Sequence, residues 1–252
     1  MNFQDKNVLI TGGSRGIGKA TAIAFAEAGA RVAINFRTNK NAAMETVSLL
    51  SGNGHFAIKA DIGHPPSVEK LLDKVVEIMG SIDIVVNNAG IHEEHPADGV
   101  DYETWQREWL KTLQVNLVGP ANVSYCAAQH MIRQGGGRIV NVSSRGAFRG
   151  EPTQPAYGAS KAGLNSMSQS LAQGLAKHNI FVGVVAPCFV ETDLTRSILE
   201  SERGAGIKNQ SPLKRVARPE EVAKGILFLA AEGTEFMTGA ILDINGASYL
   251  RS

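Results

Sequence analysis

Short runs of apolar, mostly β-branched residues recur along the chain and alternate with longer segments of helical periodicity. Seven of these runs are predicted as strands: 7–11, 31–35, 55–60, 83–89, 138–144, 181–187 and 240–245. Most are almost continuously hydrophobic, which is typical of parallel strands covered by helices on both faces. The segments between them are predicted as helices: 16–28, 40–51, 67–79, 101–133, 155–177 and 219–231. This alternation predicts an α/β fold with a doubly wound, parallel, seven-stranded sheet.

We predict that the whole chain, 1–252, forms one domain. Its length allows one large domain or two small ones, but no internal repeat, low-complexity tract or linker rich in Pro, Gly and Ser divides it. The stretch 191–218 is charged, contains Gly and Pro, and has weaker periodicity. We interpret it as a mobile helical lid over the substrate, with an ordinary surface excursion as the alternative.

The balance of charge and the cysteine usage exclude several classes of protein. The chain has 25 Lys and Arg against 24 Asp and Glu, a net charge of +1, so it lacks a basic footprint for nucleic acid. Cys126 and Cys188 lie far apart and imply neither a disulfide framework nor a zinc site. No run approaches the roughly 18 apolar residues of a transmembrane helix, and the N-terminus lacks the pattern of a signal peptide. We therefore expect a soluble, cytoplasmic protein without a membrane partner.

Glycines cluster where the first predicted strand meets the first predicted helix. The segment TGGSRGIG (11–18) contains three spaced glycines, Gly12, Gly16 and Gly18. Such glycines permit a tight turn and let a pyrophosphate approach backbone N–H groups at the helix N-terminus. The spacing G-x-x-x-G-x-G differs from the ordinary G-x-G-x-x-G pattern and leaves room for the side chains of Ser14 and Arg15. The turn predicts a dinucleotide-binding site.

The end of the second predicted strand indicates which dinucleotide binds. NAD sites commonly place an acid there to bond the ribose 2′-hydroxyl, but the chain reads AINFR (33–37) and has no Asp or Glu until Glu45. Arg37 and Arg15 instead suit a 2′-phosphate, because a guanidinium matches phosphate geometry. We therefore favour NADP(H) over NAD(H). If both arginines are ordinary surface residues, NAD(H) is the alternative.

A phenol and an amine lie one helical turn apart in YGASK (157–161). Positions i and i+4 of a helix share a face, with Cβ atoms about 5–6 Å apart, so Tyr157 and Lys161 are expected to be neighbours. A lysine ammonium close to a phenol favours the phenolate and lowers the pKa of the phenol. The pair therefore predicts a group that gives or takes a proton near neutral pH. Taken alone, the pair is also consistent with a solvated helix face.

These features occur together in an order that resembles the short-chain dehydrogenase/reductase family. The matching residues, in family order and over nearly the whole chain, are TGGSRGIG (11–18), Asp61, NNAG (87–90), Asn116, Ser143-Ser144, YGASK (157–161) and FMTGAILDING (236–246). Within the family, the motifs resemble the 3-oxoacyl-[acyl-carrier-protein] reductase branch. The resemblance implies a Rossmann-type single domain that binds a nicotinamide cofactor and carries a catalytic tetrad.

The resemblance assigns the tetrad to matching positions: Asn116, Ser144, Tyr157 and Lys161. Ser144 is preferred to Ser143 because it lies thirteen residues before Tyr157, the usual spacing in the family. Tyr157 would act as the general acid when a carbonyl is reduced and as the general base when an alcohol is oxidised. Lys161 would lower the pKa of the phenol and hold ribose hydroxyls of the cofactor, and Ser144 would donate a hydrogen bond to the substrate oxygen.

Asn116 lies inside the predicted helix 101–133, where asparagine is a poor helix former. We therefore expect a local break in the helix at this residue. The resemblance implies that such a break holds a water that links Lys161 to solvent. A capping or kink residue is a compatible alternative.

The resemblance also implies a set of cofactor contacts. They are Gly12, Ser14, Arg15, Gly16, Ile17, Gly18, Arg37, Asp61, Ile62, Asn88, Ala89, Gly90, Tyr157, Lys161, Pro187, Val190 and Thr192. In this set, Asp61 would contact the adenine, and residues 88–90 would line the adenosine ribose and support the sheet. Val190 and Thr192 would meet the carboxamide and a phosphate.

Two positions depart from the pattern of the family. In APCFVETD (186–193), Cys188 replaces the glycine that usually follows proline, so the backbone is strained if its φ is positive, or the pocket is simply narrower. We do not expect Cys188 to act as a nucleophile, because no histidine neighbours it in sequence. In INGA (244–247), Asn245 replaces an acid, which would alter contacts between subunits near the C-terminus.

The loop IHEEHPADGV (91–100) gathers histidines and acids that resemble metal ligands. Its two histidines, His92 and His95, are three residues apart in a predicted loop, and the H-E-x-x-H order of a helical zinc site is absent. We therefore expect no metal. The loop follows the fourth predicted strand, at the end of the sheet where ligands bind, so His92 or Glu94 is a candidate substrate contact.

The sequence as a whole predicts an NADP(H)-dependent oxidoreductase that transfers a hydride between nicotinamide and a ketone or secondary alcohol, with Tyr157 as general acid and base. One alternative is a 3-oxoacyl-[acyl-carrier-protein] reductase, although the segments that would dock an acidic carrier, 133–138 and 173–179, are thin in arginine. The other is a catalytically silent dinucleotide sensor, although such members of the family usually lack the Tyr or the Lys. The expected partner is a small-molecule carbonyl or alcohol. The family also implies a homo-oligomer, a dimer or a tetramer, with segment 164–175 supplying an interface helix.

Overall fold

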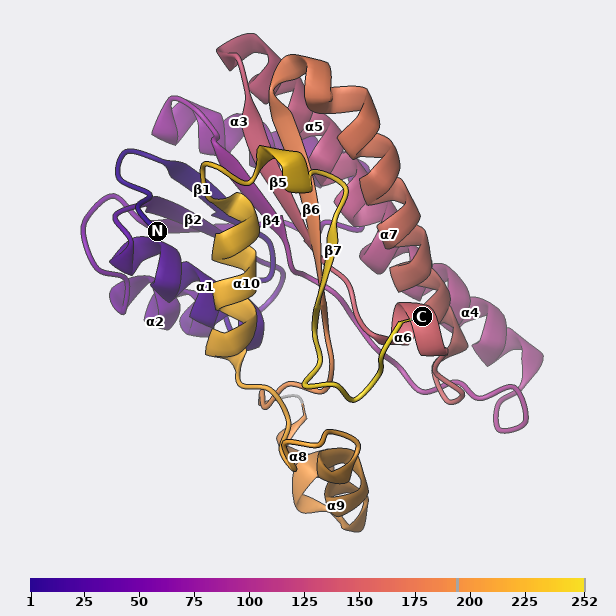
Figure 1. Cartoon of the computed structure of the whole chain (residues 1–252). Helices are drawn as coiled ribbons and strands as arrows, with labels where there is room; N and C mark the ends of the chain where they lie inside the picture. The colour runs from indigo at the N-terminus through magenta and orange to yellow at the C-terminus, as the bar shows by residue number, and fades with distance from the viewer. Residues whose placement is uncertain (194, 252) are drawn as a thin grey trace.

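A parallel sheet of seven strands forms the centre of the protein, as seen in a computed structural model that describes residues 1–193 and 195–251 (Figure 1). The strand order is β3-β2-β1-β4-β5-β6-β7, and all neighbouring strands run parallel. The strands are β1 (Asn7–Ile10), β2 (Arg31–Phe36), β3 (Phe56–Lys59), β4 (Ile84–Asn87), β5 (Gly137–Val142), β6 (Ile180–Pro187) and β7 (Ile241–Ile244). All seven predicted strands are confirmed, with small shifts at their ends. The predicted doubly wound α/β fold is therefore confirmed.

Helices flank both faces of this sheet. The helices of the described residues are α1 (Gly16–Glu27), α2 (Lys40–Ser48), α3 (Pro65–Met79), α4 (Tyr102–Leu113), α5 (Gly119–Gln134), α6 (Gly146–Arg149), α7 (Pro155–Leu175), α8 (Arg196–Glu200), α9 (Glu202–Asn209) and α10 (Pro219–Ala230). α1 and α10 lie side by side on one face, and α3, α5 and α7 cover the other (Figure 1). The sheet is therefore buried on both faces, as its continuous apolar runs predict.

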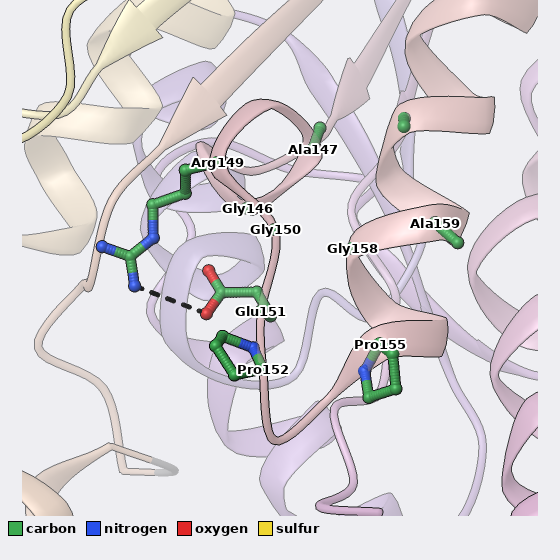
Figure 2. A pocket seen from close by; sticks show the side chains of 10 residues that line it. Gly146, Ala147, Arg149, Gly150, Glu151, Pro152, Pro155, Gly158 and Ala159 are labelled. Carbon is green, nitrogen blue, oxygen red and sulfur yellow. Dashed lines mark ion pairs between the residues drawn. The ribbon is translucent and has the colours of Figure 1, made fainter. Parts of the chain in front are cut away.

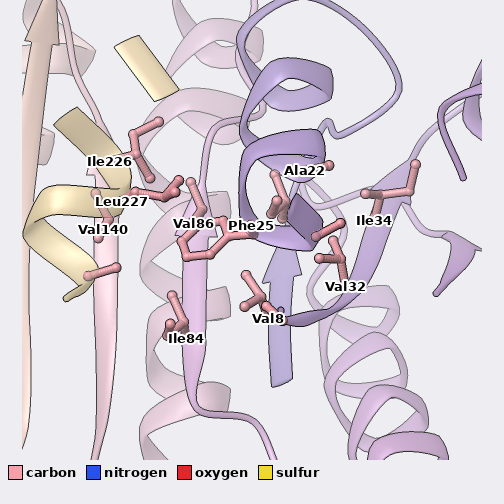
Figure 3. Packing of buried hydrophobic residues seen from close by; sticks show 14 of the residues in the cluster. Val8, Ala22, Phe25, Val32, Ile34, Ile84, Val86, Val140, Ile226 and Leu227 are labelled. Atoms are coloured by element: carbon pink, nitrogen blue, oxygen red, sulfur yellow. The ribbon is translucent and has the colours of Figure 1, made fainter. Parts of the chain in front are cut away.

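Successive residues of a strand face two separate hydrophobic cores. In β1, Val8 and Ile10 face the core that includes α1 and α10, whereas Leu9 faces the core that includes α3 and α5. Figure 3 shows the first core, in which Phe25 of α1 lies among side chains from the strands and α10. The side chains of Val8, Leu9, Ile10 and Phe25 are all fully buried. This alternation fixes the register of β1, because a shift by one residue would exchange its two faces.

The predicted helix 101–133 is interrupted in its middle. α4 ends at Leu113, a π-helical turn, η1, runs over Gln114–Val118, and α5 begins at Gly119. The prediction of one continuous helix is therefore wrong, whereas the predicted local break at Asn116 is confirmed. Turns of this kind are frequent at functional sites.

The chain that follows β6 leaves the body of the protein and forms α8 and α9 beyond the end of the sheet (Figure 1). Segment 191–218 is thus partly helical, and its role as a lid stays a prediction. Position 194 of that segment and position 252 of the predicted single domain lie outside the described residues. Two observed elements have no counterpart in the sequence prediction, α6 and η3 (Glu235–Met237), and the end of the predicted helix 155–177 forms a separate short helix, η2 (Ala176–His178). No helix in the described part of the chain has the length and apolar character needed to span a bilayer.

The direction of the strand order changes between β1 and β4. From β1 the sheet continues outward through β2 and β3, and from β4 it continues outward through β5, β6 and β7. In open parallel sheets, ligands bind beyond the carboxyl ends of the strands at such a point. Here the loops after β1 and β4 meet, because the side-chain amide of Asn88 donates to the carbonyl of Thr11 at 2.9 Å. The fold therefore brings the glycine turn and the NNAG segment together.

Candidate functional site

The turn between β1 and α1 has a backbone that favours glycine. Gly12 and Gly16 have φ angles of 63° and 54°, in the left-handed region. α1 begins with no side-chain hydrogen bond from its N-cap, Arg15, and with no acidic residue in its first turn. The N–H groups at this helix end therefore face outward without side-chain caps, and a helix N-terminus of this kind favours an anion.

Gly18 has no space for a side chain. A Cβ at this position would lie 2.3 Å from the carbonyl oxygen of Gly12 and 2.6 Å from Nδ2 of Asn88. A Cβ on Gly12 would in turn lie 2.9 Å from the Cα of Ala89. The first turn of α1, the glycine turn and the loop after β4 thus pack backbone to backbone. This close packing is the cradle that a pyrophosphate-binding turn requires, so the residues present fit a dinucleotide.

Two asparagines fasten the glycine turn to the neighbouring strands. The amide of Asn88 donates to the carbonyls of Thr11 and Gly12, at 2.9 and 3.1 Å. Asn35 in β2 accepts the N–H of Gly13 at its backbone carbonyl, at 3.0 Å, and its own side chain is buried. The turn is therefore held from both sides by the protein itself. The sequence prediction included Asn88 and missed Asn35.

Two exposed arginines flank the end of β2 and the start of α1. Arg37 directly follows β2, and Arg15 directly precedes α1. Neither forms an ion pair within residues 1–193 and 195–251. Glu45, the first acid after β2, pairs with Lys19 at 3.0 Å. Both guanidinium groups are thus accessible at the place where the sequence predicts a 2′-phosphate.

The remaining predicted cofactor residues of the loop after β6 approach the glycine turn. A Cβ on Gly16 would lie 3.2 Å from Cγ2 of Thr192. Val190 is buried and forms an isolated parallel bridge with Ala217, and Pro187 is the buried last residue of β6. The structure therefore brings this loop and the glycine turn together across the carboxyl end of the sheet.

The predicted adenine contact lies at the end of β3. Asp61 is half-buried, and its Oδ1 accepts the N–H of Gly63 at 2.8 Å. Ile62, the next residue, is buried. Ser14 and Ile17 of the glycine turn are half-buried. Asp61 and Ile62 follow the carboxyl end of β3, as the glycine turn follows that of β1, and their contact with the cofactor stays a prediction.

Ser144 and Tyr157 face each other beyond β5. The Oγ of Ser144 accepts the N–H of Gly146 at 3.0 Å, and the serine is close enough to Tyr157 to lower the pKa of its phenol. Ser143 instead donates to the backbone carbonyl of Lys161, at 3.3 Å. Of the two adjacent serines, Ser144 is therefore the one that the structure brings to the tyrosine.

Lys161 lies one turn along α7 from Tyr157, with its Nζ 5.7 Å from the centre of the phenol ring. The amine is buried and donates to the carbonyl of Val142 at 2.8 Å. A Cβ on Gly90 would lie 3.5 Å from Nζ, so the NNAG loop borders the amine. The predicted proximity of the phenol and the amine is confirmed, although the hydrogen bond of the amine goes to the backbone.

The pKa of Tyr157 is shifted in the direction opposite to the prediction. Burial is the largest cause and raises the pKa of the phenol, a hydrogen bond with Ser144 lowers it in part, and the charge of Glu151 raises it. Burial also lowers the pKa of Lys161 to about 8. The expectation that the ammonium lowers the pKa of the phenol is therefore wrong for this structure. Burial disfavours the charged form of both groups.

Lys161 gives a prediction about stability and pH. Its pKa is about 8 in the folded protein, below the ordinary 10.5, so between these values the unfolded chain binds the proton and the folded protein does not. The free energy of unfolding should therefore rise with pH in this window, by at most about 3 kcal/mol. In Lys161→Met this rise should disappear, as measured by urea unfolding at several pH values across the window.

The matched control for that measurement is Lys177→Met, because Lys177 is exposed in η2. This variant should keep the rise with pH. An equal rise in Lys161→Met and in the unmodified protein would show that another group is responsible.

Asn116 ties the π-helical turn to the loop after β4. Its Oδ1 accepts the N–H of Ile91 and its Nδ2 donates to the carbonyl of the same residue, both at 2.8 Å. The Nδ2 also donates to Oγ of Ser160 on α7, at 3.2 Å. Asn116 is therefore placed beside the residue that precedes Lys161. Its predicted role in holding a water stays a prediction.

The two histidines of the loop 91–100 have different surroundings. His92 is half-buried, and its ring centre lies 6.3 Å from that of Tyr157. His95 is fully buried, with Nδ1 2.8 Å from the carbonyl of Glu93 and Nε2 accepting an N–H from the first turn of α7 at 3.2 Å. Within residues 1–193 and 195–251, no group of His, Cys, Asp and Glu side chains is arranged to hold a metal ion. His95 therefore anchors the loop, and His92 is the histidine near the phenol.

Cys188 is accommodated without the left-handed backbone that glycine favours. The described residues with positive φ do not include it. Its N–H donates to the carbonyl of Ile244 at 3.1 Å, and its thiol donates to the carbonyl of Phe189 at 3.2 Å. Burial raises the pKa of the thiol, which keeps it protonated and unreactive. Strain at this position is therefore not the consequence of replacing glycine.

A cavity of about 420 Å³ lies beside α6 and the first turns of α7 (Figure 2). Its lining residues are Gly146, Ala147, Arg149, Gly150, Glu151, Pro152, Pro155, Gly158, Ala159 and Ala162. They include Gly158, Ala159 and Ala162 of α7 but neither Tyr157 nor Lys161. The cavity is therefore next to the reacting pair in sequence but faces another side of the helix.

Comparisons with known proteins agree with the motifs and the fold. A family model described as enoyl-(acyl carrier protein) reductase matches residues 12–247. The chain is 37% identical over 250 residues to the 3-oxoacyl-[acyl-carrier-protein] reductase of Escherichia coli (strain K12), covering 99% of this chain and 100% of that protein. It is 40% identical over 255 residues to an uncharacterized oxidoreductase of Thermotoga maritima, covering 98% and 99%. In three dimensions it is similar to a short-chain type dehydrogenase/reductase from Mycobacterium ulcerans, with a TM-score of 0.91, 32% identity, and coverage of 98% of this chain and 91% of that one.

Proposed function

The chain belongs to the short-chain dehydrogenase/reductase family of NAD(P)-dependent oxidoreductases, and we propose that it uses NADP(H) to interconvert a ketone and a secondary alcohol. One observation carries the proposal. A glycine turn that fits a pyrophosphate lies at the same end of the sheet as a phenol, a hydroxyl and an amine in mutual proximity, Tyr157, Ser144 and Lys161.

When bound, the nicotinamide group supplies or accepts the hydride. The residues of the chain provide the proton and the alignment. The hydroxyl of Tyr157 would give its proton to the substrate oxygen as the carbonyl is reduced. The hydroxyl of Ser144 would donate a hydrogen bond to the same oxygen and stabilise its developing charge. Lys161, whose amine borders Gly90 of the NNAG loop, would hold ribose hydroxyls of the cofactor.

The raised pKa of Tyr157 keeps the phenol in its protonated form. A protonated phenol is the form that gives a proton to a carbonyl oxygen, and the phenol oxygen takes the proton back when an alcohol is oxidised. Ketone reduction and alcohol oxidation are therefore both part of the proposed function.

A panel of ketones offered with NADPH and, separately, with NADH tests the proposed function. The absorbance of the reduced cofactor reports turnover. We expect at least one class of ketone to be reduced, and faster with NADPH than with NADH. Binding of NADPH without oxidation across a broad panel would favour a dinucleotide sensor. Failure to bind either cofactor would reject the proposal.

Arg37→Ala should weaken the binding of NADPH about tenfold and leave the Kd of NADH nearly unchanged. The reason is that the variant lacks the guanidinium proposed to bond the 2′-phosphate, which only NADPH carries. Titration of cofactor fluorescence measures both constants. Arg107→Ala, at an exposed position on α4, serves as the control and should leave both constants unchanged. An equal loss of affinity for the two cofactors would contradict the assignment of Arg37.

A 3-oxoacyl-[acyl-carrier-protein] reductase is the second candidate, because the Escherichia coli relative carries that name. An acidic carrier needs basic residues near the site. Two arginines of segment 191–218 are exposed, but each already forms an ion pair. Arg196 pairs with Asp193 at 3.4 Å, and Arg203 pairs with Glu94 at 3.5 Å. A carrier-bound 3-oxoacyl group that is reduced much faster than the same acyl group on free pantetheine would support this candidate. Equal rates would count against it.

We also propose that the chain assembles with copies of itself. Exposed apolar side chains follow one side of η1 and α5: Val118, Tyr125 and Ile132. Residues seven apart share a helix face, so the three form a stripe of the kind that helices bury against each other. Sedimentation velocity measures the assembly, and a monomer at micromolar concentration would contradict the proposal.

A further inference from the structure

Arg145 carries a buried positive charge directly after Ser144 in the chain. The residue is only 3% exposed. Within residues 1–193 and 195–251, no carboxylate lies at ion-pair distance from its guanidinium. Burying a charge is costly unless a group of opposite charge accompanies it. The guanidinium is thus buried without such a partner.

The side chains that contact this guanidinium are neutral. Nη1 donates to Oγ of Ser248 at 2.7 Å, and Nη2 donates to Oε1 of Gln210. The guanidinium carbon also lies 5.8 Å from the ring centre of Phe189. Burial lowers the pKa of Arg145, and the charge of Arg149 adds to this effect. The contacts therefore satisfy hydrogen bonds but do not neutralise the charge.

An acid whose charge acts on this group is paired with another arginine. Glu151 is close enough for its charge to act on Arg145, but it pairs with Arg149 at 3.6 Å (Figure 2). The two arginines and the one glutamate leave one positive charge in excess. That excess lies with Arg145, the more deeply buried of the two arginines.

Arg145 contacts three segments that are distant from it in sequence: β6, segment 191–218 and the C-terminal tail. Its backbone N–H donates to the carbonyl of Pro187, at the end of β6, at 3.0 Å. Gln210 belongs to segment 191–218, the predicted lid, and is exposed, so it is free to turn aside for a ligand. A neutral polar side chain would bond Gln210 and Ser248 without the cost of a buried charge. The positive charge is therefore explained by a ligand of negative charge.

We infer that Arg145 is a specificity-determining residue that binds a carboxylate of the substrate, so that the reacting pair is a keto acid and its hydroxy acid. This inference rests on the proposed function. A guanidinium presents parallel N–H donors that match the two oxygens of a carboxylate. The hydroxyl of Ser248, which accepts from Nη1, would donate its own proton to the same group. We place the carbonyl of such a molecule at Ser144 and Tyr157 and its carboxylate at Arg145, the next residue along the chain.

Matched pairs of ketones separate charge recognition from catalysis. Each pair consists of a keto acid and the amide of the same acid, both offered with NADPH. The unmodified protein should show a kcat/KM about 10- to 100-fold higher for the acids. Arg145→Gln should lose this preference, because its kcat/KM should fall much further with the acids than with the amides. Equal losses for acid and amide would indicate a purely structural role and overturn the inference, as would a preference of the unmodified protein for the amides.

Two further variants sharpen the comparison. Arg145→Lys keeps a positive charge without the planar fork, so it should retain part of the preference for acids even if Arg145→Gln fails to fold. Arg149→Gln is the matched control, since this arginine is exposed and already paired with Glu151, and it should keep the full preference. Loss of the preference in Arg149→Gln but not in Arg145→Lys would place the anion site elsewhere and overturn the assignment.

A binding measurement decides the inference without turnover. The complex of the protein with NADPH is titrated with propanoate and, separately, with propanamide, and cofactor fluorescence is followed. Propanoate should bind to the unmodified protein and at least about tenfold more weakly to Arg145→Gln, whereas propanamide should not distinguish them. Absence of propanoate binding, or equal binding to both proteins, would overturn the inference. If no ketone of either charge is reduced although NADPH binds, the proposed function fails, and this titration still decides the anion site.

Discussion

Tyr157→Phe should lower kcat at least about 100-fold while the Kd of NADPH changes little. The substitution removes the hydroxyl and keeps the ring, and loss of a general acid typically costs 10²- to 10⁴-fold in rate. The ring itself contacts His92, with centres 6.3 Å apart, so its packing survives the change. Single-turnover absorbance of NADPH with a ketone substrate measures the chemical step, and cofactor fluorescence measures binding.

The control for this variant is Tyr102→Phe, which removes a hydroxyl from a tyrosine that is 75% exposed on α4. Its kcat should equal that of the unmodified protein. A rate for Tyr157→Phe within a few fold of the unmodified rate would remove the phenol from proton transfer. It would leave the serine and the lysine without a partner for the proposed chemistry.

Gly18→Ala should abolish measurable binding of NADPH and lower the free energy of unfolding by about 1–3 kcal/mol. The added Cβ would lie 2.3 Å from the carbonyl oxygen of Gly12 and 2.6 Å from the amide of Asn88. Neither atom is free to retreat, because Asn88 is bonded to the carbonyls of Thr11 and Gly12. The glycine turn must therefore shift, and with it the N–H groups proposed to bind the pyrophosphate. Fluorescence titration and urea unfolding measure the two effects.

Gly174→Ala is the matched control, since Gly174 lies in α7 and a Cβ there meets nothing within 4 Å. Alanine is the better helix former by about 1 kcal/mol, so this variant should be as stable as the unmodified protein or more stable. It should also bind NADPH normally. If Gly18→Ala bound NADPH as tightly as this control, the close packing of the turn would have no part in cofactor binding.

The sheet was predictable because most of its strands are buried and so appear in the sequence as nearly continuous apolar runs. β1 and β4 are examples. The glycine turn directly follows β1 and NNAG begins at the last residue of β4, and this order led to the predicted cofactor site. The break near Asn116 was also predictable, from one poor helix former within a long helical pattern. These are local patterns, and local patterns determine most of this fold.

The charge properties of the site were not predictable, because they depend on residues that are distant in sequence. The spacing of Tyr157 and Lys161 predicted a lowered pKa for the phenol, whereas burial raises it. Arg145 was missed for the same reason. Its partners Gln210 and Ser248 lie 65 and 103 residues away along the chain, so only the folded protein reveals its surroundings.

The C-terminal tail, which supplies Ser248 to Arg145, has a practical consequence for anyone who handles this protein. Tyr249 bonds the carbonyl of Phe148 at 3.5 Å, and the guanidinium of Arg251 lies 4.4 Å from the centre of the Phe148 ring. A purification tag or fluorescent fusion attached at this end would lie next to residues that contact Phe148, four positions after Ser144. Such labels are better placed before Met1, which is exposed. Rates measured with a carboxyl-terminal label would partly report the label.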